Sequence, residues 1–126
     1  MLKYITESEY IDLLGTQSVP DKFDNLAIEA SNYINYQTHG RIDLNNVSEQ
    51  VKYVTCLIVN LIDEENTKLK EIGNLKSQNI EGWSETYATP EEIKADYSNK
   101  KYDVLKKYLS YEIGSDGNPL LYCGVY

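Results

Sequence analysis

One long stretch, residues 48–73, constrains the fold more than any other part of the sequence. Ser48 is a favourable N-cap, and Val47 supplies the apolar residue that often precedes a cap and packs back onto the helix. Apolar side chains then recur at helical spacing, at Val51, Val54, Ile58, Leu61 and Ile62. The pattern predicts a helix that runs to Gly73 and forms the centre of the core.

Three consecutive carboxylates, Asp63, Glu64 and Glu65, lie within this predicted helix. A helix that ended directly after them would place negative charge at the negative end of its dipole. The helix is therefore expected to continue past Lys68, which can pair with Glu64 four residues earlier. Because neighbouring residues on a helix point in different directions, the three side chains do not converge on one atom. We expect them to be solvated.

Two shorter helices are predicted before the long one. Thr6 and Glu9 have the spacing of a capping box, and Gly15 provides a stop, so the first helix is expected between them. The second is expected from about residue 21 to residue 38, with Gly40 in the left-handed position beyond its end. Its apolar face is formed by Phe23, Leu26, Ala27, Ala30 and Ile34.

A fourth helix is predicted near the C-terminus. Thr89 is its expected N-cap, Pro90 takes the first helical position, Glu92 closes a capping box and Gly114 is the expected stop. The inward side chains are predicted to be Ile93, Tyr97, Val104, Leu105 and Tyr108. The surface pairs are predicted to be Asp96 with Lys100 and Asp103 with Lys107. The sequence thus predicts a mainly α protein, a small bundle of about four helices.

The length and charge of the chain bound its organisation and its partners. A chain of 126 residues is expected to form one domain, with a helical body at about 6–73 and 89–114. The net charge of −8 has the wrong sign for a protein that binds phosphate by releasing counterions. No apolar run reaches the ~20 residues of a membrane span, and the N-terminus lacks the apolar stretch of a signal peptide. We expect synthesis in the cytoplasm and no membrane contact.

The residues that commonly perform chemistry do not form a recognisable site. His39, the only histidine, adjoins Gly40 at a predicted helix end, where capping or exposure is expected. Cys56 lies in an apolar run and is expected to be a buried thiol, while Cys123 has no partner at metal-ligand spacing. The sequence contains no Gly-rich phosphate loop, nucleophile elbow or zinc pattern. We therefore expect no enzyme, no metal and no cofactor.

The only tryptophan, Trp83, lies in a segment that is too polar for core and lacks helical apolar spacing. Gly82 gives the backbone freedom there, while Trp83 and Tyr87 offer large contact areas. An extended loop or hairpin, at about residues 74–88, is expected between the third and fourth helices. Trp83 is a candidate anchor on a neighbouring protomer, and the alternative is that it folds back onto its own helices.

The chain ends in a mostly apolar strip after a turn at residues 116–119. Chain termini are usually polar, so this strip is expected to be buried either on the core of the protomer or on another molecule. The sequence leaves both alternatives open. An extended tail is predicted at about residues 115–126, and its apolar residues are Leu120, Leu121, Tyr122, Val125 and Tyr126.

The order of these features resembles the head-tail connector family of tailed bacteriophages and prophage elements, in its YqbG-like branch. The resemblance covers nearly the whole chain. Its first piece is the F-x-x-L-x-x-x-A-S-x-x-I run from Phe23 to Ile34, which is followed by Gly40, Arg41 and Ile42. Its second piece is Ser77, Ile80, Gly82, Ser84 and Tyr87, and its third is Leu121, Tyr122, Gly124 and Val125. Relatives often have a basic residue where this chain has Cys123.

The resemblance implies a structural virion protein at the head-tail junction, in the neck of the particle. Such a protomer forms a closed ring, generally a dodecamer, beneath the portal protein. The ring continues the DNA channel, contacts a downstream neck or tail completion protein, and lets double-stranded DNA pass without specific binding. The acidic composition is compatible with a lumen that repels phosphate.

The resemblance also implies roles for the two unexplained segments. The segment with Ile80, Trp83 and Tyr87 is expected to contact a neighbouring subunit or the lumen. The strip formed by Leu120, Leu121, Tyr122, Val125 and Tyr126 is expected to be a tail that docks onto the portal.

Two other classes of function remain as alternatives. The twelve tyrosines fit a protein-binding adaptor unrelated to phages, because tyrosine is enriched at interfaces. A helix-turn-helix DNA reader around Gly40 and Arg41 is disfavoured by the net charge and by the lack of a basic recognition helix.

Overall fold

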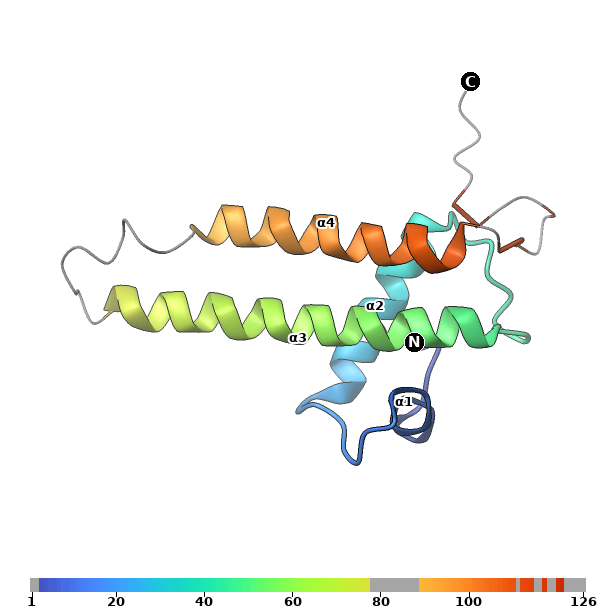
Figure 1. Ribbon diagram of the computed structural model, residues 1–126, viewed down its shortest axis with the longest axis horizontal. Helices are drawn as coiled ribbons and strands as arrows, with labels where there is room; N and C mark the ends of the chain where they lie inside the picture. The colour runs from blue at the N-terminus through green and yellow to red at the C-terminus, as the bar shows by residue number, and fades with distance from the viewer. Residues whose placement is uncertain (1–2, 78–88, 111, 115–116, 118–119, 122–126) are drawn as a thin grey trace, which may run out of the picture.

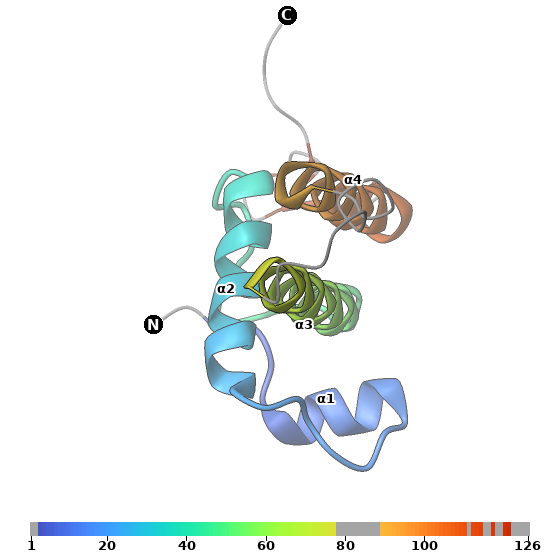
Figure 2. The ribbon, with the colours of Figure 1, turned by 90° about the vertical axis from the view of Figure 1, so that its left-hand side faces the viewer.

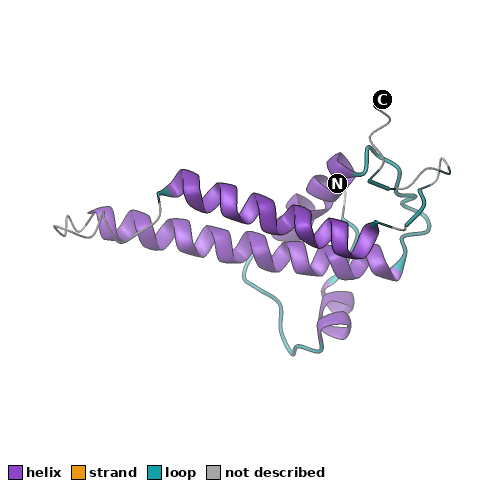
Figure 3. Ribbon diagram, turned by 45° about the horizontal axis from the view of Figure 1, so that its top comes forward, coloured by secondary structure: helices purple, strands orange, loops and turns teal. Residues whose placement is uncertain are grey.

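The computed structural model of the chain describes residues 3–77, 89–110, 112–114, 117 and 120–121. These residues form four helices, α1 (Glu7–Leu14), α2 (Phe23–Gln37), α3 (Glu49–Ser77) and α4 (Pro90–Leu109) (Figure 1). Within the described ranges there is no β-strand (Figure 3). The predicted fold class, mainly α with about four helices, is therefore confirmed. None of the helices in the described ranges is long and apolar enough to cross a membrane.

Helix α3 lies at the centre of the arrangement and contacts the other three helices. Helix α4 runs antiparallel beside it, and the two extend beyond α2 as an elongated pair (Figure 1). Helix α2 crosses the pair, and α1 lies on the side of α3 that is opposite α4 (Figure 2). The fold thus places α1 and α4 on two different sides of one shared helix.

The start of α1 follows the predicted capping box closely. The Thr6 side chain accepts a hydrogen bond from the backbone N–H of Glu9, and the Glu9 carboxylate accepts one from the backbone N–H of Thr6. Gly15 ends the helix with φ 66°, in the left-handed region that favours glycine. Both ends of this helix were predictable because the deciding residues lie within one turn of them.

Helix α2 starts at Phe23, two positions later than predicted, after Lys22 with φ 58°. Its C-terminal end contains two consecutive left-handed residues, His39 and Gly40, with φ 55° and 70°. The Gly40 N–H donates to the Asn35 carbonyl over 3.0 Å, which satisfies one of the last carbonyls of the helix. The left-handed position predicted for Gly40 is confirmed.

The predicted caps of α3 and α4 are present, whereas both predicted stops are wrong. The Ser48 and Thr89 hydroxyls each accept a hydrogen bond from a backbone N–H in the first turn of their helices. Helix α3 continues past Gly73 to Ser77, since an interior glycine only lowers helix stability by about 1 kcal/mol relative to alanine. Helix α4 ends at Leu109, well before Gly114.

The core is continuous from α1 to the C-terminal end of α4. Leu105 is buried in this core, and Val104 and Tyr108 are half-buried against it. Ile93 and Tyr97, the other predicted inward residues of α4, are buried in a second, smaller cluster. Tyr10 and Phe23 pack edge to face with ring centroids 5.3 Å apart, which joins α1 to α2. The Tyr10 hydroxyl also donates to the side-chain oxygen of Asn60 on α3. Aromatic packing and one polar contact thus fix α1 against the other helices.

The expectation of three solvated carboxylates in α3 is wrong for Glu65. Its side chain is only 15% exposed and lies 3.4 Å from the ammonium of Lys101 on α4, which is 17% exposed. The same ammonium lies 5.4 Å from the centre of the Tyr33 ring on α2. Glu64 also has a contact, because it accepts a hydrogen bond of 3.3 Å from the Tyr97 hydroxyl. These contacts bind three helices together in a way that the spacing within one helix does not reveal.

We predict that Lys101→Met destabilises the protein by about 1–3 kcal/mol, because it leaves the Glu65 carboxylate without its cation in a mostly buried position. Lys3→Met is the control, since the Lys3–Asp24 pair is much more exposed and should contribute about 0–1 kcal/mol. Urea unfolding of both variants measures the difference. Equal losses in the two variants would contradict a structural role for the Glu65–Lys101 pair.

Stability should also depend on pH through Glu9, which forms an ion pair with Lys52 between α1 and α3. The hydrogen bond from Lys52 lowers the pKa of Glu9 below its ordinary value of 4.5, and hydrogen bonds from Thr6 add to this effect. A carboxyl with a lowered pKa stabilises the fold above its ordinary pKa and loses that contribution as the pH falls through the folded pKa. We expect the free energy of unfolding of Glu9→Gln to fall less steeply below pH 4.5 than that of the wild type. Glu29→Gln is the control and should follow the wild type. Unfolding curves from pH 7 to pH 3 measure the difference.

Candidate docking site

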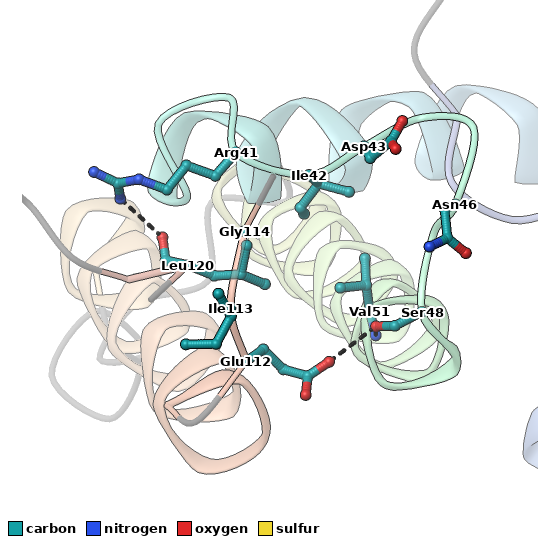
Figure 4. Close-up of a pocket in the computed structure, with 10 residues that line it drawn as sticks. All are labelled: Arg41, Ile42, Asp43, Asn46, Ser48, Val51, Glu112, Ile113, Gly114 and Leu120. Atoms are coloured by element: carbon teal, nitrogen blue, oxygen red, sulfur yellow. Dashed lines mark hydrogen bonds between the residues drawn. The ribbon is translucent and has the colours of Figure 1, made fainter. Parts of the chain in front are cut away.

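A pocket of about 310 Å³ lies where three distant segments of the chain meet (Figure 4). The segment between α2 and α3 supplies one wall, the first turns of α3 supply the second, and the residues after α4 supply the third. The lining residues are Arg41, Ile42, Asp43, Asn46, Ser48, Val51, Glu112, Ile113, Gly114 and Leu120. The volume is at the lower end of the ~300–1,000 Å³ typical of ligand pockets.

Glu112 links the start of α3 to the residues that follow α4. Its carboxylate accepts a 3.0 Å hydrogen bond from the Ser48 hydroxyl, and its backbone carbonyl accepts one of 2.8 Å from the N–H of Leu120. Its own N–H donates to the carbonyl of Leu109 at the end of α4. One residue therefore fixes the end of α4, the start of α3 and the returning chain at Leu120.

Arg41 closes the pocket from the opposite side. Its guanidinium donates to the Leu120 carbonyl over 3.3 Å (Figure 4). Gly114 runs so close to Arg41 that a Cβ added to the glycine would lie 2.5 Å from the Arg41 Cβ. Gly114 is needed for this close approach of two chain segments, not for the helix stop that the sequence predicted. The sequence shows that position 114 is a glycine, but it does not show why. The reason is a contact with Arg41, which is far away in the sequence.

The lining of the pocket offers both charged and apolar groups. The Ser48 hydroxyl serves as the N-cap of α3 and donates to Glu112, and its position is explained by those two contacts. The lining combines a guanidinium and carboxylates with the apolar side chains of Ile42, Val51 and Ile113. Such a mixture suits an extended peptide, which offers both backbone polar groups and side chains.

The other candidate reactive groups lie outside this pocket. His39 is exposed at the end of α2, as expected. Cys56 is fully buried in α3, and burial raises the pKa of its thiol from 9.0 to about 11. A thiol with a raised pKa is a poor nucleophile at neutral pH. Across the described parts of the chain, no three His, Cys, Asp or Glu side chains are grouped so that they could hold a metal ion.

The predicted docking strip is partly explained by the pocket. Leu120 is only 3% exposed and belongs to the main core, and Leu121 is half-buried against the same core. Leu120 therefore has no surface left for a partner, which corrects its predicted role: the strip begins as part of the protomer. Tyr122, Val125 and Tyr126 lie outside the described residues.

The second predicted contact segment, with Ile80, Trp83 and Tyr87, also lies outside the described residues. What the structure does describe are the helices that flank it. The C-terminal end of α3 and the N-terminal end of α4 lie together at the end of the pair that extends away from α2 (Figure 1). Comparison of the chain with protein-family models, with curated proteins and with solved structures finds no match.

We predict that Gly114→Ala destabilises the protein by about 1–3 kcal/mol, because the added methyl group clashes with Arg41. An Arg41→Gly background removes the Arg41 Cβ and Cδ that the methyl group would meet, so the same substitution should cost less there. A double-mutant cycle measured by thermal unfolding gives the coupling between the two positions. Additive effects would contradict the steric explanation for Gly114.

Proposed function

We propose that this chain is a structural adaptor of the head-tail connector type, which forms a ring beneath the portal of a tailed phage or a phage-derived particle. The ring would continue the DNA channel and link the head to tail or neck proteins. The proposal rests on the sequence resemblance, and one feature of the fold supports it in particular.

The supporting observation is that the first piece of the resemblance lies in the core and that Arg41, which follows it, contacts the residue directly before the third piece. In the run from Phe23 to Ile34, the five residues of the pattern are all buried, namely Phe23, Leu26, Ala30, Ser31 and Ile34. Arg41, which follows that run, donates to the carbonyl of Leu120, directly before the third piece.

The shape of the protomer suits a ring subunit with two contact ends. The α3–α4 pair is a long, packed element, and Tyr97 and Ile93 extend its core toward the end that carries the Trp83 segment. The ammonium group of Lys100 on α4 lies 4.5 Å from the centre of the Tyr97 ring, and that of Lys68 on α3 lies 5.5 Å from it. These cation–π contacts help to hold Tyr97 between the two helices. Such an element can hold a contact segment at a fixed distance from the rest of the protomer.

The charge of the protein supports passage of DNA without binding. A channel made from subunits of net charge −8 repels the phosphate backbone, so DNA would not be held in the lumen by counterion release. The same charge also opposes association of free copies. A ring that forms on a portal template is therefore the form that we propose.

An adaptor unrelated to phages remains the second candidate. Tyr36 and Tyr102 are 77% and 42% exposed, and exposed tyrosines favour a protein partner. The helix-turn-helix alternative fits less well, because the connection from Thr38 to Ser48 is longer than the ~3–4-residue turn of that motif.

The test is the mass distribution of the purified protein by light scattering, with and without a cognate portal ring. We expect monomers to become a stoichiometric ring when portal is added. Trp83→Ala should weaken this assembly more than it lowers the melting temperature. Leu105→Ala, which truncates a fully buried side chain, should do the reverse. A protein that stays monomeric in the presence of portal would contradict the proposal and favour the adaptor alternative.

A further inference from the structure

The buried apolar residues between α3 and α4 fall into two clusters. The main core, which also includes α1 and α2, reaches Ile62 on α3 and Leu105 on α4. Further along the pair, Ile93 and Tyr97 are buried in a second cluster. Leu61 is half-buried and packs against both clusters. The apolar packing along the pair is therefore narrow at one point.

Polar side chains lie at this narrow point. Glu65 on α3 and Lys101 on α4 form a mostly buried ion pair of 3.4 Å about one turn beyond the main core. The ring of Tyr33 on α2 covers the Lys101 ammonium at 5.4 Å. Next to this pair, the Tyr97 hydroxyl donates to the Glu64 carboxylate over 3.3 Å. We call the Glu65–Lys101 pair and the Glu64–Tyr97 hydrogen bond the polar layer.

Beyond the main core, the pair buries few side chains. Within residues 63–71 of α3 and 90–100 of α4, which we call the distal unit, Ile93 and Tyr97 are the only buried residues. By contrast, buried residues recur along α3 from Val51 to Ile62. Burial of apolar surface is the dominant favourable term in folding. The described part of the distal unit therefore gains less from burial than the rest of the protomer, which we call the body.

We propose that the distal unit opens as a cooperative unit of its own while the body stays folded, and that the polar layer forms the boundary between them. Separating the pair at this layer returns two charges to water, and their hydration offsets much of the lost attraction. Separating it within the main core would expose apolar surface with no such compensation. The closed form remains the main population. Opening is a property of the single protomer and does not require the proposed function.

Separate opening would give the outer end of the α3–α4 pair a freedom that the body lacks. Local opening costs less free energy than global unfolding, so the outer end can change its conformation without loss of the fold. A partner that binds only the closed distal unit would suppress the opening, because it would shift the population toward the closed form.

The test is amide hydrogen exchange of the full chain, resolved by residue with NMR. The amides of residues 66–71 and 94–100 are compared with those of residues 54–62 and 105–109. All four ranges lie inside helices and beyond the first four residues of their helix, so unbonded N–H groups at a helix start do not explain a difference. We expect the distal amides to exchange at least about tenfold faster than those of the body.

The variant Glu65→Leu/Lys101→Met replaces the ion pair with apolar side chains of similar size, a change that is often neutral or stabilising. It should join the two clusters and reduce the difference in exchange to less than about threefold. Lys3→Met/Asp24→Leu is the control, because it makes the same kinds of substitution at an exposed ion pair away from the distal unit. The control should keep the wild-type difference.

A second variant, Tyr97→Phe, removes the hydroxyl that bonds to Glu64 and retains the ring. It should speed exchange in the distal unit by about threefold to tenfold and leave the body unchanged. Equal exchange of the distal unit and the body in the wild type would overturn the proposal, since the protomer would then open as one unit. A difference that persists in Glu65→Leu/Lys101→Met would show that the polar layer is not the boundary.

Discussion

The packing of α3 against the other three helices is the constraint on which the rest of the structure depends. The fully buried residues Val54, Cys56, Ile58 and Val59 point to more than one side of this helix, so a single apolar partner could not cover them. Helices α1, α2 and α4 cover different sides of it. Because α1 and α4 are separated by α3, each retains an outer surface of its own. The opposed surfaces of the protomer follow directly from the burial of one central helix.

The local features of this fold were predictable from the sequence, and the reason is visible at the helix ends. A capping hydroxyl such as that of Thr6, Ser48 or Thr89 bonds to a backbone N–H three residues away, so the sequence contains both partners in one turn. The apolar faces of α2 and α4 were also predicted, since helical spacing determines them. The order and type of the helices therefore followed from short-range physics, whereas the ends of α3 and α4 did not.

The candidate site was not predictable in the same way, because its contacts join residues far apart in the chain. Glycine has several uses, and the sequence could not show that Gly114 is required by the approach of Arg41. Glu65 looked solvated because its partner Lys101 is fixed only by the register between α3 and α4. Leu120 looked like a free docking residue for the same reason, since its burial depends on Glu112 and Arg41. In each case, the sequence does not show which residue of a distant segment lies in contact with the residue in question.

The two proposed contact segments of the adaptor start at opposite ends of α3. Leu120 is held beside the first turn of α3, whereas the Trp83 segment follows the last turn of the same helix. A helix of 29 residues is about 40 Å long at ~1.5 Å per residue, so the two segments start from points separated by roughly that distance. One partner surface of small extent therefore cannot bind both starting points. A ring subunit has two kinds of neighbour, the adjacent copy and the portal, and this separation matches a protomer that meets them at different ends.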